Sequence, residues 1–151
     1  MDRKPIIAVD GVSGSGKSSI ARAIAKKYGL LYIDTGAMYR AVTYYAMRKN
    51  YLSQGEFLKN LLIADLNKIK IDFAPNGHTL LDGEDVEEAI RSMEVSENVS
   101  LVSTVPEVRM AMVLLQRGVS RDHGIVMDGR DIGTVVFPEA DVKLFIVSDP
   151  R

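Results

Sequence analysis

A glycine-rich segment near the start of the chain has the residue types that a phosphate site needs. Gly11–Ser18 reads G-V-S-G-S-G-K-S and matches the pattern G-x-x-x-x-G-K-[ST]. Small residues allow backbone N–H groups to curl around phosphate oxygens, and a lysine at this position can reach the outer phosphates of a nucleotide. A serine hydroxyl directly after the lysine is a suitable Mg²⁺ ligand. The segment therefore predicts a triphosphate site with Lys17 at the phosphates and Ser18 at the metal.

A nucleoside triphosphate is the ligand that we expect this P-loop to bind. A glycine- and serine-rich turn that only joins two elements is the plainest alternative, but such a turn has no reason to end in Gly-Lys-Ser at the start of a helix. The residues expected to contact this nucleotide, which the family resemblance described below implies is ATP, are Gly11, Val12, Ser13, Gly14, Ser15, Gly16, Lys17, Ser18 and Ser19.

A second candidate for metal chemistry is Asp128, which ends the apolar run Ile125–Met127. An aspartate at the end of a buried strand can hold Mg²⁺ through a water molecule beside a P-loop. Apolar runs that end in aspartate are common, so this prediction depends on the loop.

The segments that must position these residues alternate between strand and helix patterns. Short apolar runs predict buried strands at 6–9, 30–33, 125–127 and 144–147. Helical periodicity is present at 17–28, at 38–46 and from Pro106 to about Gly118. This alternation predicts an α/β fold in which helices flank a parallel sheet of the P-loop NTPase type.

The middle of the chain has a different pattern, because Ile69, Ile71 and Phe73 alternate with polar residues. Asn76-Gly77 separates this run from Thr79–Leu81 and predicts a tight hairpin with positive φ angles. We expect a small antiparallel insert at about residues 60–85.

Composition excludes several classes of function. The net charge of the 151 residues is -1, which provides no general basic surface for nucleic acid, and the chain has no cysteine and two histidines. Disulfides and a zinc cluster are therefore not expected. No run approaches the length of a membrane span, so we expect a soluble, cytoplasmic protein with no membrane partner.

The P-loop alone does not distinguish a switch GTPase, a motor or transport ATPase and a small-molecule kinase. A GTPase would show the motif Asn-Lys-x-Asp and an aspartate with glycine three residues later. The chain has only Asn67-Lys68-Ile69-Lys70, and no aspartate is followed by glycine at that spacing. The sequence therefore disfavours the GTPase class.

Segments across nearly the whole chain resemble bacterial cytidylate kinases, which are P-loop nucleoside monophosphate kinases. They are D-T-G-A-M-Y-R at 34–40, L-D-G-E-D-V at 81–86, I-R-S at 90–92, P-E-V-R at 106–109 and D-G-R-D-I-G-T-V-V-F-P at 128–138. The resemblance implies transfer of the γ-phosphoryl group of ATP to CMP or dCMP with Mg²⁺, giving ADP and CDP or dCDP. It also implies one kinase domain, with a core of about 1–50 and 104–151 and a monophosphate-binding insert of about 51–103.

The resemblance further implies an acceptor site made of Thr35, Arg40, Ser100, Arg109, Arg130 and Asp131. Arg40 and Arg130 match the positions at the phosphate, and Ser100, Arg109 and Asp131 match those at the base. Lys17, Asp128 and Arg130 are the expected catalytic residues. A carboxylate such as Asp131 can accept a hydrogen bond from the amino group of cytosine but is repelled by the carbonyl of uracil.

Family members continue past the strand near Val147 with an arginine-rich lid over ATP, a further strand and a last helix, and this chain ends at Arg151. We therefore expect very weak activity from these residues. The alternatives are another monophosphate kinase that accepts UMP or AMP, and a catalytically silent nucleotide-binding fragment. A monomer that binds ATP, CMP and dCMP is expected, and the cluster of tyrosines at 28–45 is expected to pack between helix and sheet.

Overall fold

The computed structural model describes residues 5–11, 16–53, 55–122, 124–129 and 140–146, with side chains described as far as Val119 in the last helix. The chain forms two compact units. Unit 1 comprises the chain up to Thr35 and from Gln116 onward, and unit 2 is Gly36–Leu115.

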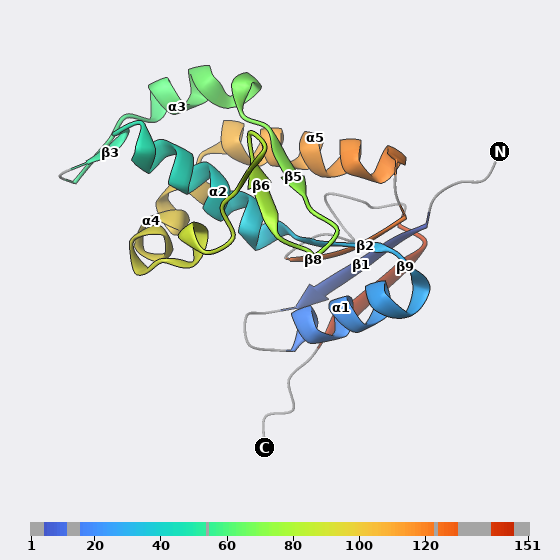
Figure 1. The fold of residues 1–151 in the computed structure, drawn as a ribbon. Coiled ribbons are helices and arrows are strands. Elements are labelled where there is room, and N and C mark those ends of the chain that lie inside the picture. Colours follow the sequence, from blue (N-terminus) through green and yellow to red (C-terminus); the bar gives the residue numbers. More distant parts are fainter. Residues whose placement is uncertain (1–4, 12–15, 54, 123, 130–139, 147–151) are drawn as a thin grey trace. The chain divides into compact units, whose positions relative to one another are not determined.

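Unit 1 contains a four-stranded parallel sheet in the order β2-β8-β1-β9 (Figure 1). Its strands are β1 (Ile6–Gly11), β2 (Leu31–Asp34), β8 (Ile125–Gly129) and β9 (Val142–Ile146). Every residue of β8 is buried, as expected for a central parallel strand. The predicted α/β fold with a parallel sheet is therefore confirmed.

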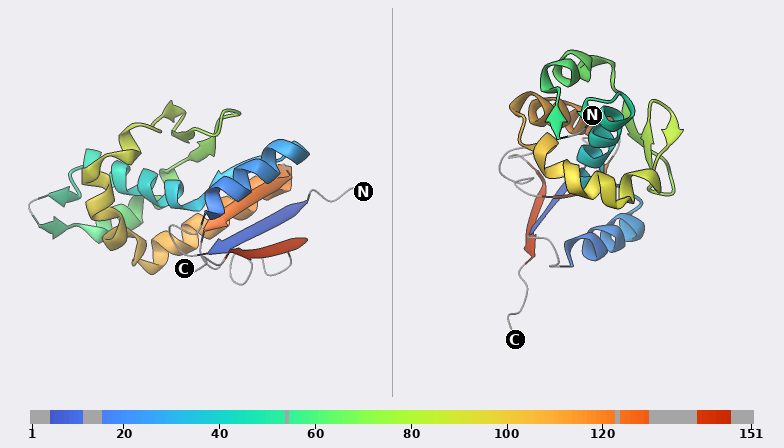
Figure 2. Two further views of the ribbon diagram at one scale, coloured as in Figure 1. Left: turned by 90° about the horizontal axis from the view of Figure 1, so that it is seen from below. Right: turned by 90° about the vertical axis from the view of Figure 1, so that its left-hand side faces the viewer.

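Helix α1 (Lys17–Tyr28) covers one face of this sheet (Figure 2). Ala21 and Ala25 lie on its buried face and pack with Val9 and Val126 in one apolar cluster. The predicted bounds of this helix are confirmed. The helix ends at Gly29, whose left-handed backbone lets its N–H reach the carbonyl of Ala25.

Unit 2 consists of helices and small antiparallel sheets. Its helices are α2 (Thr35–Arg48), α3 (Lys59–Asp65), η1 (Leu66–Lys68), η2 (Ala89–Arg91), α4 (Met93–Ser103) and α5 (Pro106–Asp122). Its strands are β3 (Leu52–Ser53), β4 (Glu56–Phe57), β5 (Ile71–Phe73), β6 (Thr79–Leu81) and β7 (Glu84–Asp85). Helices α2 and α5 each contribute residues to both units.

The antiparallel insert is present, and the hairpin predicted at Asn76-Gly77 joins β5 to β6. Gly77 has the predicted positive φ angle, 87°, but Asn76 does not, and the loop is longer than two residues, with the N–H of Ala74 donating to the carbonyl of His78. The side chain of Asn76 instead accepts from the N–H of His78 at 2.9 Å. The two-residue turn lies between β6 and β7, where Asp82 and Gly83 have φ angles of 50° and 86°.

Helix α5 also differs from its prediction, because it continues past Gly118 to Asp122. Glycine lowers helix stability by about 1 kcal/mol but does not end a helix by itself. The start of the helix at Pro106 is confirmed, since proline has the φ angle of a first helical residue.

Among the described residues, no single helix has the length and apolar character of a membrane span. The bent pair Met93–Ser103 and Pro106–Val119 meets that test by length and composition only.

We expect Met127→Ala to lower the free energy of unfolding by about 2 to 5 kcal/mol, because this side chain is 0% exposed in the central strand. Met110 is 69% exposed on α5 and provides the control, since Met110→Ala should change stability by less than about 0.5 kcal/mol. Urea denaturation measures both values. Equal losses in the two variants would contradict the placement of β8 in the core.

Candidate nucleotide-binding site

The chain enters α1 through Gly16, whose φ angle of 86° is left-handed. Glycine reaches this conformation without steric cost. No side chain caps the start of α1, and no acidic residue lies in its first turn. The first N–H groups of the helix can therefore donate hydrogen bonds to an anion. Ser18 is half-buried and Ser19 exposed in this turn.

Lys17 directs its ammonium group at the carboxyl ends of two neighbouring strands. Its Nζ donates to the carbonyl of Gly11 at 2.7 Å and lies 3.5 Å from the carbonyl of Gly129. In open parallel sheets, ligands bind outside these strand ends. The predicted phosphate-binding lysine therefore lies where such a ligand would be held.

Asp128 is 3% exposed, and its Oδ2 accepts from the hydroxyl of Tyr32 at 2.7 Å. Burial is the main cause that raises the pKa of Asp128 to about 6, and the nearby Asp34 acts in the same direction. The Tyr32 hydrogen bond and the charges of Lys17 and Arg22 lower this pKa. The carboxylate is thus mostly ionised at neutral pH and lies within the electrostatic influence of Lys17.

Thr35 begins α2 directly after β2, and it is buried. Its hydroxyl donates to the backbone carbonyl of Asp128 at 2.8 Å. This bond ties the start of α2 to the end of β8, so Thr35 has a structural partner besides any ligand.

In unit 2, the guanidinium group of Arg40 is held by two neighbours. Its Nη1 donates to the carbonyl of Ile90 at 3.1 Å and to the hydroxyl of Ser96 at 2.8 Å. Ser100 lies four residues after Ser96 on α4 and therefore on the same face of that helix. The structure thus brings Arg40 to the helix face that contains Ser100.

The adjacent residue Tyr39 interacts electrostatically with the side chain of Arg109 on α5. Burial raises the pKa of Tyr39, and the positive charge of Arg109 opposes that rise. Two consecutive residues of α2 are therefore linked to α4 and to α5, the helices that contain Ser100 and Arg109.

The predicted site residues fall into three groups. Gly11, Gly16, Lys17, Ser18, Ser19, Thr35 and Asp128 belong to unit 1. Arg40, Ser100 and Arg109 belong to unit 2. Val12, Ser13, Gly14, Ser15, Arg130 and Asp131 lie outside the described residues.

Sequence reasoning missed the contacts of Tyr32, Tyr39 and Ser96. It treated the tyrosines as packing residues, whereas Tyr32 binds Asp128 and Tyr28 is 62% exposed on α1. Ser96 could have been found from its spacing, since it lies one helical turn before the predicted Ser100. Tyr32 had no comparable signal, because its partner is distant in the sequence.

A P-loop helix start beside a lysine and a buried aspartate, at the carboxyl edge of a parallel sheet, defines a P-loop nucleotide-binding protein. Residues 7–151 match the sequence model of the family described as cytidylate kinase. The chain belongs to the cytidylate kinase family.

Individual relatives agree with this assignment. The chain is 50% identical to a cytidylate kinase of Pelotomaculum thermopropionicum over 100% of its own length and 67% of that protein. It is 47% identical to a cytidylate kinase of Porphyromonas gingivalis over 97% of its length and 65% of that protein. The chain thus spans about two thirds of the length of these curated relatives. A crystal structure of TT1252 from Thermus thermophilus is a more distant match, with 17% identity and a TM-score of 0.45 over 97% of this chain and 66% of that one.

We expect Tyr32→Phe to raise the pKa of Asp128 above its value of about 6, because the lost hydroxyl stabilises the charged form of the carboxylate. The variant should also lose about 1 to 3 kcal/mol of unfolding free energy at a pH where Asp128 is ionised. Carboxyl ¹³C NMR across the titration measures the pKa, and urea denaturation the stability. Tyr28→Phe, which changes an exposed tyrosine, is the control, and an unchanged Asp128 titration in Tyr32→Phe would refute the expectation.

Proposed function

We propose that this chain contains the nucleotide sites of a cytidylate kinase, an enzyme that transfers the γ-phosphoryl group of ATP to CMP or dCMP. The products are ADP and CDP or dCDP. The observation that carries the proposal is the match of residues 7–151 to this family. It is supported by relatives named cytidylate kinase, one of which is 50% identical to this chain. Membership in a kinase family implies the use of ATP.

The proposed donor site is the P-loop and the start of α1. The left-handed Gly16 and the uncapped first turn support phosphate binding through backbone N–H groups. Lys17 would exchange its carbonyl contacts at Gly11 and Gly129 for phosphate oxygens, which are stronger partners because they are charged. Catalysis by this lysine consists of holding the donor and neutralising charge as it moves toward the leaving ADP.

The donor set of this site fits Mg²⁺. Among the described residues, no group of three or more His, Cys, Asp or Glu side chains could hold a metal ion by itself. Mg²⁺ in kinases is bound by one or two side chains, with phosphates and water as its other ligands, so the hydroxyl of Ser18 and the carboxylate of Asp128 would suffice. When bound, the ion supplies positive charge between the outer phosphates.

The proposed acceptor site uses Arg40, Ser100 and Arg109 of unit 2, with Thr35, Arg130 and Asp131 added on the strength of the family motifs. Phosphoryl transfer joins two anions, so the acceptor phosphate needs cations that cancel repulsion and align its attacking oxygen. Arg40 is suited to this because its two hydrogen bonds restrict its rotamers before any ligand binds. Arg130 is the proposed second cation at the phosphate.

Selectivity for cytosine is proposed to come from Asp131, with Ser100 and Arg109 at the base. A carboxylate accepts from the amino group of cytosine and leaves a buried repulsive contact with uracil. The interaction of Tyr39 with Arg109 supports this arrangement, because it places the guanidinium group beside the residue that precedes Arg40.

The division into a core of 1–50 and 104–151 and a monophosphate-binding insert of 51–103 stays part of the proposal. So do a monomeric state and a cytoplasmic location. The near-neutral net charge of -1 and the lack of cysteine are compatible with both.

Lys17→Ala is expected to abolish ADP release with ATP, Mg²⁺ and CMP, because the variant lacks the ammonium group that would bind the outer phosphates. Activity of the parent chain is first established with a coupled assay over CMP, dCMP, UMP and AMP, and calorimetry measures ATP and CMP binding separately. Lys26→Ala, a change on the exposed side of α1, is the control. Preferred phosphorylation of UMP or AMP would refute the substrate assignment, and a folded chain that binds neither ATP nor CMP would refute the site itself.

Ser96→Ala is expected to raise the KM or Kd for CMP roughly three- to tenfold, since Arg40 loses one of the two contacts that hold it. ATP affinity should not change. Ser103→Ala on the same helix is the matched control, because that hydroxyl donates to the backbone carbonyl of Val99 within the helix. Equal CMP affinity in the two variants would show that Ser96 does not position Arg40.

A further inference from the structure

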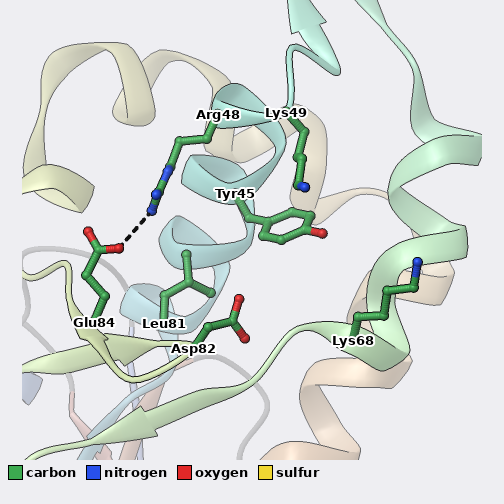
Figure 3. Close-up of a pocket in the computed structure, with 7 residues that line it drawn as sticks. All are labelled: Tyr45, Arg48, Lys49, Lys68, Leu81, Asp82 and Glu84. Carbon is green, nitrogen blue, oxygen red and sulfur yellow. Dashed lines mark hydrogen bonds and ion pairs between the residues drawn. The ribbon is translucent and has the colours of Figure 1, made fainter.

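Unit 2 contains a polar cavity of about 460 Å³ between the end of α2, η1 and the turn that joins β6 to β7 (Figure 3). Its lining residues are Tyr45, Arg48, Lys49, Lys68, Leu81, Asp82 and Glu84. This volume falls within the range of small-molecule sites, which is about 300 to 1,000 Å³.

The described residues that line the cavity are different from the residues of the proposed nucleotide contacts. None of its lining residues belongs to the P-loop or to the acceptor set. Arg40, the nearest proposed acceptor residue on α2, directs its guanidinium group to Ile90 and Ser96, which do not line the cavity.

One pair of opposite charges in the cavity is already matched. Nη1 of Arg48 donates to Oε1 of Glu84 at 3.2 Å, and the guanidinium group also lies over the ring of Tyr44. These charges cancel, so a ligand would be selected mainly by the other charged residues of the lining. Figure 3 shows this pair on one side of the cavity and the two lysines on the other.

The ammonium groups of Lys49 and Lys68 keep donors available for a ligand. Nζ of Lys49 lies 5.7 Å from the ring centroid of Tyr45, a contact that uses its charge but no N–H donor. Nζ of Lys68 lies 3.8 Å from Oδ1 of Asp65, and its side chain is 72% exposed. Each ammonium has three donors, so both can turn toward an anion.

The position of Tyr45 in the cavity lining is fixed by Asp65. The Oδ2 of Asp65 accepts from the hydroxyls of Tyr45 and Tyr51 at 3.0 and 2.7 Å. Burial and this carboxylate raise the pKa of Tyr45 to about 12. The tyrosine therefore stays neutral and its hydroxyl is engaged, which leaves the ring as an apolar surface for a ligand.

Asp82 supplies the remaining charge, at a fixed position. It occupies the first place of the two-residue turn with φ at 50°, and its Oδ1 accepts from the N–H of Lys70 at 2.9 Å. A carboxylate has capacity for further hydrogen bonds beyond this one. The cavity thus offers two cations and one anchored carboxylate around an aromatic ring.

We propose that this cavity binds a small zwitterion in which an oxyanion and an ammonium group are a few atoms apart. Lys49 and Lys68 bind the oxyanion, Asp82 accepts from the ammonium group, and the connecting carbons lie on Tyr45. A simple anion would leave Asp82 as a repulsive neighbour, so the ammonium group provides the selectivity.

Phosphoethanolamine is the probe, with inorganic phosphate and ethanolamine as the two ligands that each lack one charge. Titration with ¹H–¹⁵N NMR detection should give saturable shifts at the amides of Tyr45, Lys49, Lys68 and Glu84, with phosphoethanolamine binding at least about tenfold more tightly than either fragment. Site-resolved shifts separate this binding from phosphate at the P-loop, and they do not depend on kinase activity.

Two variants test the roles of the charges. Lys49→Met with Lys68→Met should abolish the shifts, whereas the control Lys26→Met with Lys59→Met, which changes exposed lysines outside the cavity, should preserve them. Asp82→Asn removes the negative charge but keeps a residue type that tolerates the positive φ angle at this position. This variant should lose the preference for phosphoethanolamine over phosphate. Shifts that persist without Lys49 and Lys68, or that occur only at the P-loop, would overturn the proposal.

Discussion

The parallel register of β8 between β1 and β2 is the constraint on which the described part of the candidate nucleotide site depends. It sets Asp128 opposite Val9 on one side and Asp34 on the other. Because side chains alternate along a strand, a slip of one residue would turn Asp128 to the opposite face. The same register brings the carbonyls of Gly11 and Gly129 to the edge where Lys17 meets both. One pairing therefore orients the lysine and the carboxylate together.

Preorganisation is the shared property of the polar residues in both units. Lys17, Arg40 and Asp128 each have partners within the fold, so their side-chain entropy is already reduced when a ligand arrives. The partners are mostly neutral carbonyls and hydroxyls. A charged phosphate competes well against such groups, since charge-assisted hydrogen bonds are about twice as strong as neutral ones. The site can thus be ordered and still exchange its contacts for those of a ligand.

Much of the fold could be predicted because local chemistry determined it. The bounds of α1 followed from the P-loop pattern and helical periodicity, and Pro106 marked the start of α5. Errors arose where two local signals competed. Asn76-Gly77 and Asp82-Gly83 both carry turn chemistry, and only strand pairing decides that the second forms the tight turn.

The candidate site was less predictable, because its hydrogen bonds join residues that are distant in the sequence. Local patterns identified Lys17 and Asp128 as residue types in suitable places. They gave no indication that Tyr32 would donate to Asp128 or that Ser96 would hold Arg40. Those contacts depend on register and helix packing, which a one-dimensional pattern does not contain.

The carboxylates of Asp65 and Asp128, which both accept hydrogen bonds from tyrosines, show why such environments must be seen in three dimensions. Asp65 accepts from Tyr51 and Tyr45, and these bonds, with the charge of Lys68, hold its pKa below the usual value. Asp128 accepts from Tyr32 in the same way, yet its pKa is raised to about 6 because burial outweighs the hydrogen bond. The hydroxyls therefore act in the same direction with different outcomes: at Asp65 they are the main cause of a lowered pKa, whereas at Asp128 the hydroxyl offsets part of the effect of burial and so favours the ionised carboxylate. An ionised carboxylate can attract a cation at the carboxyl edge of the sheet, which a protonated acid could not do.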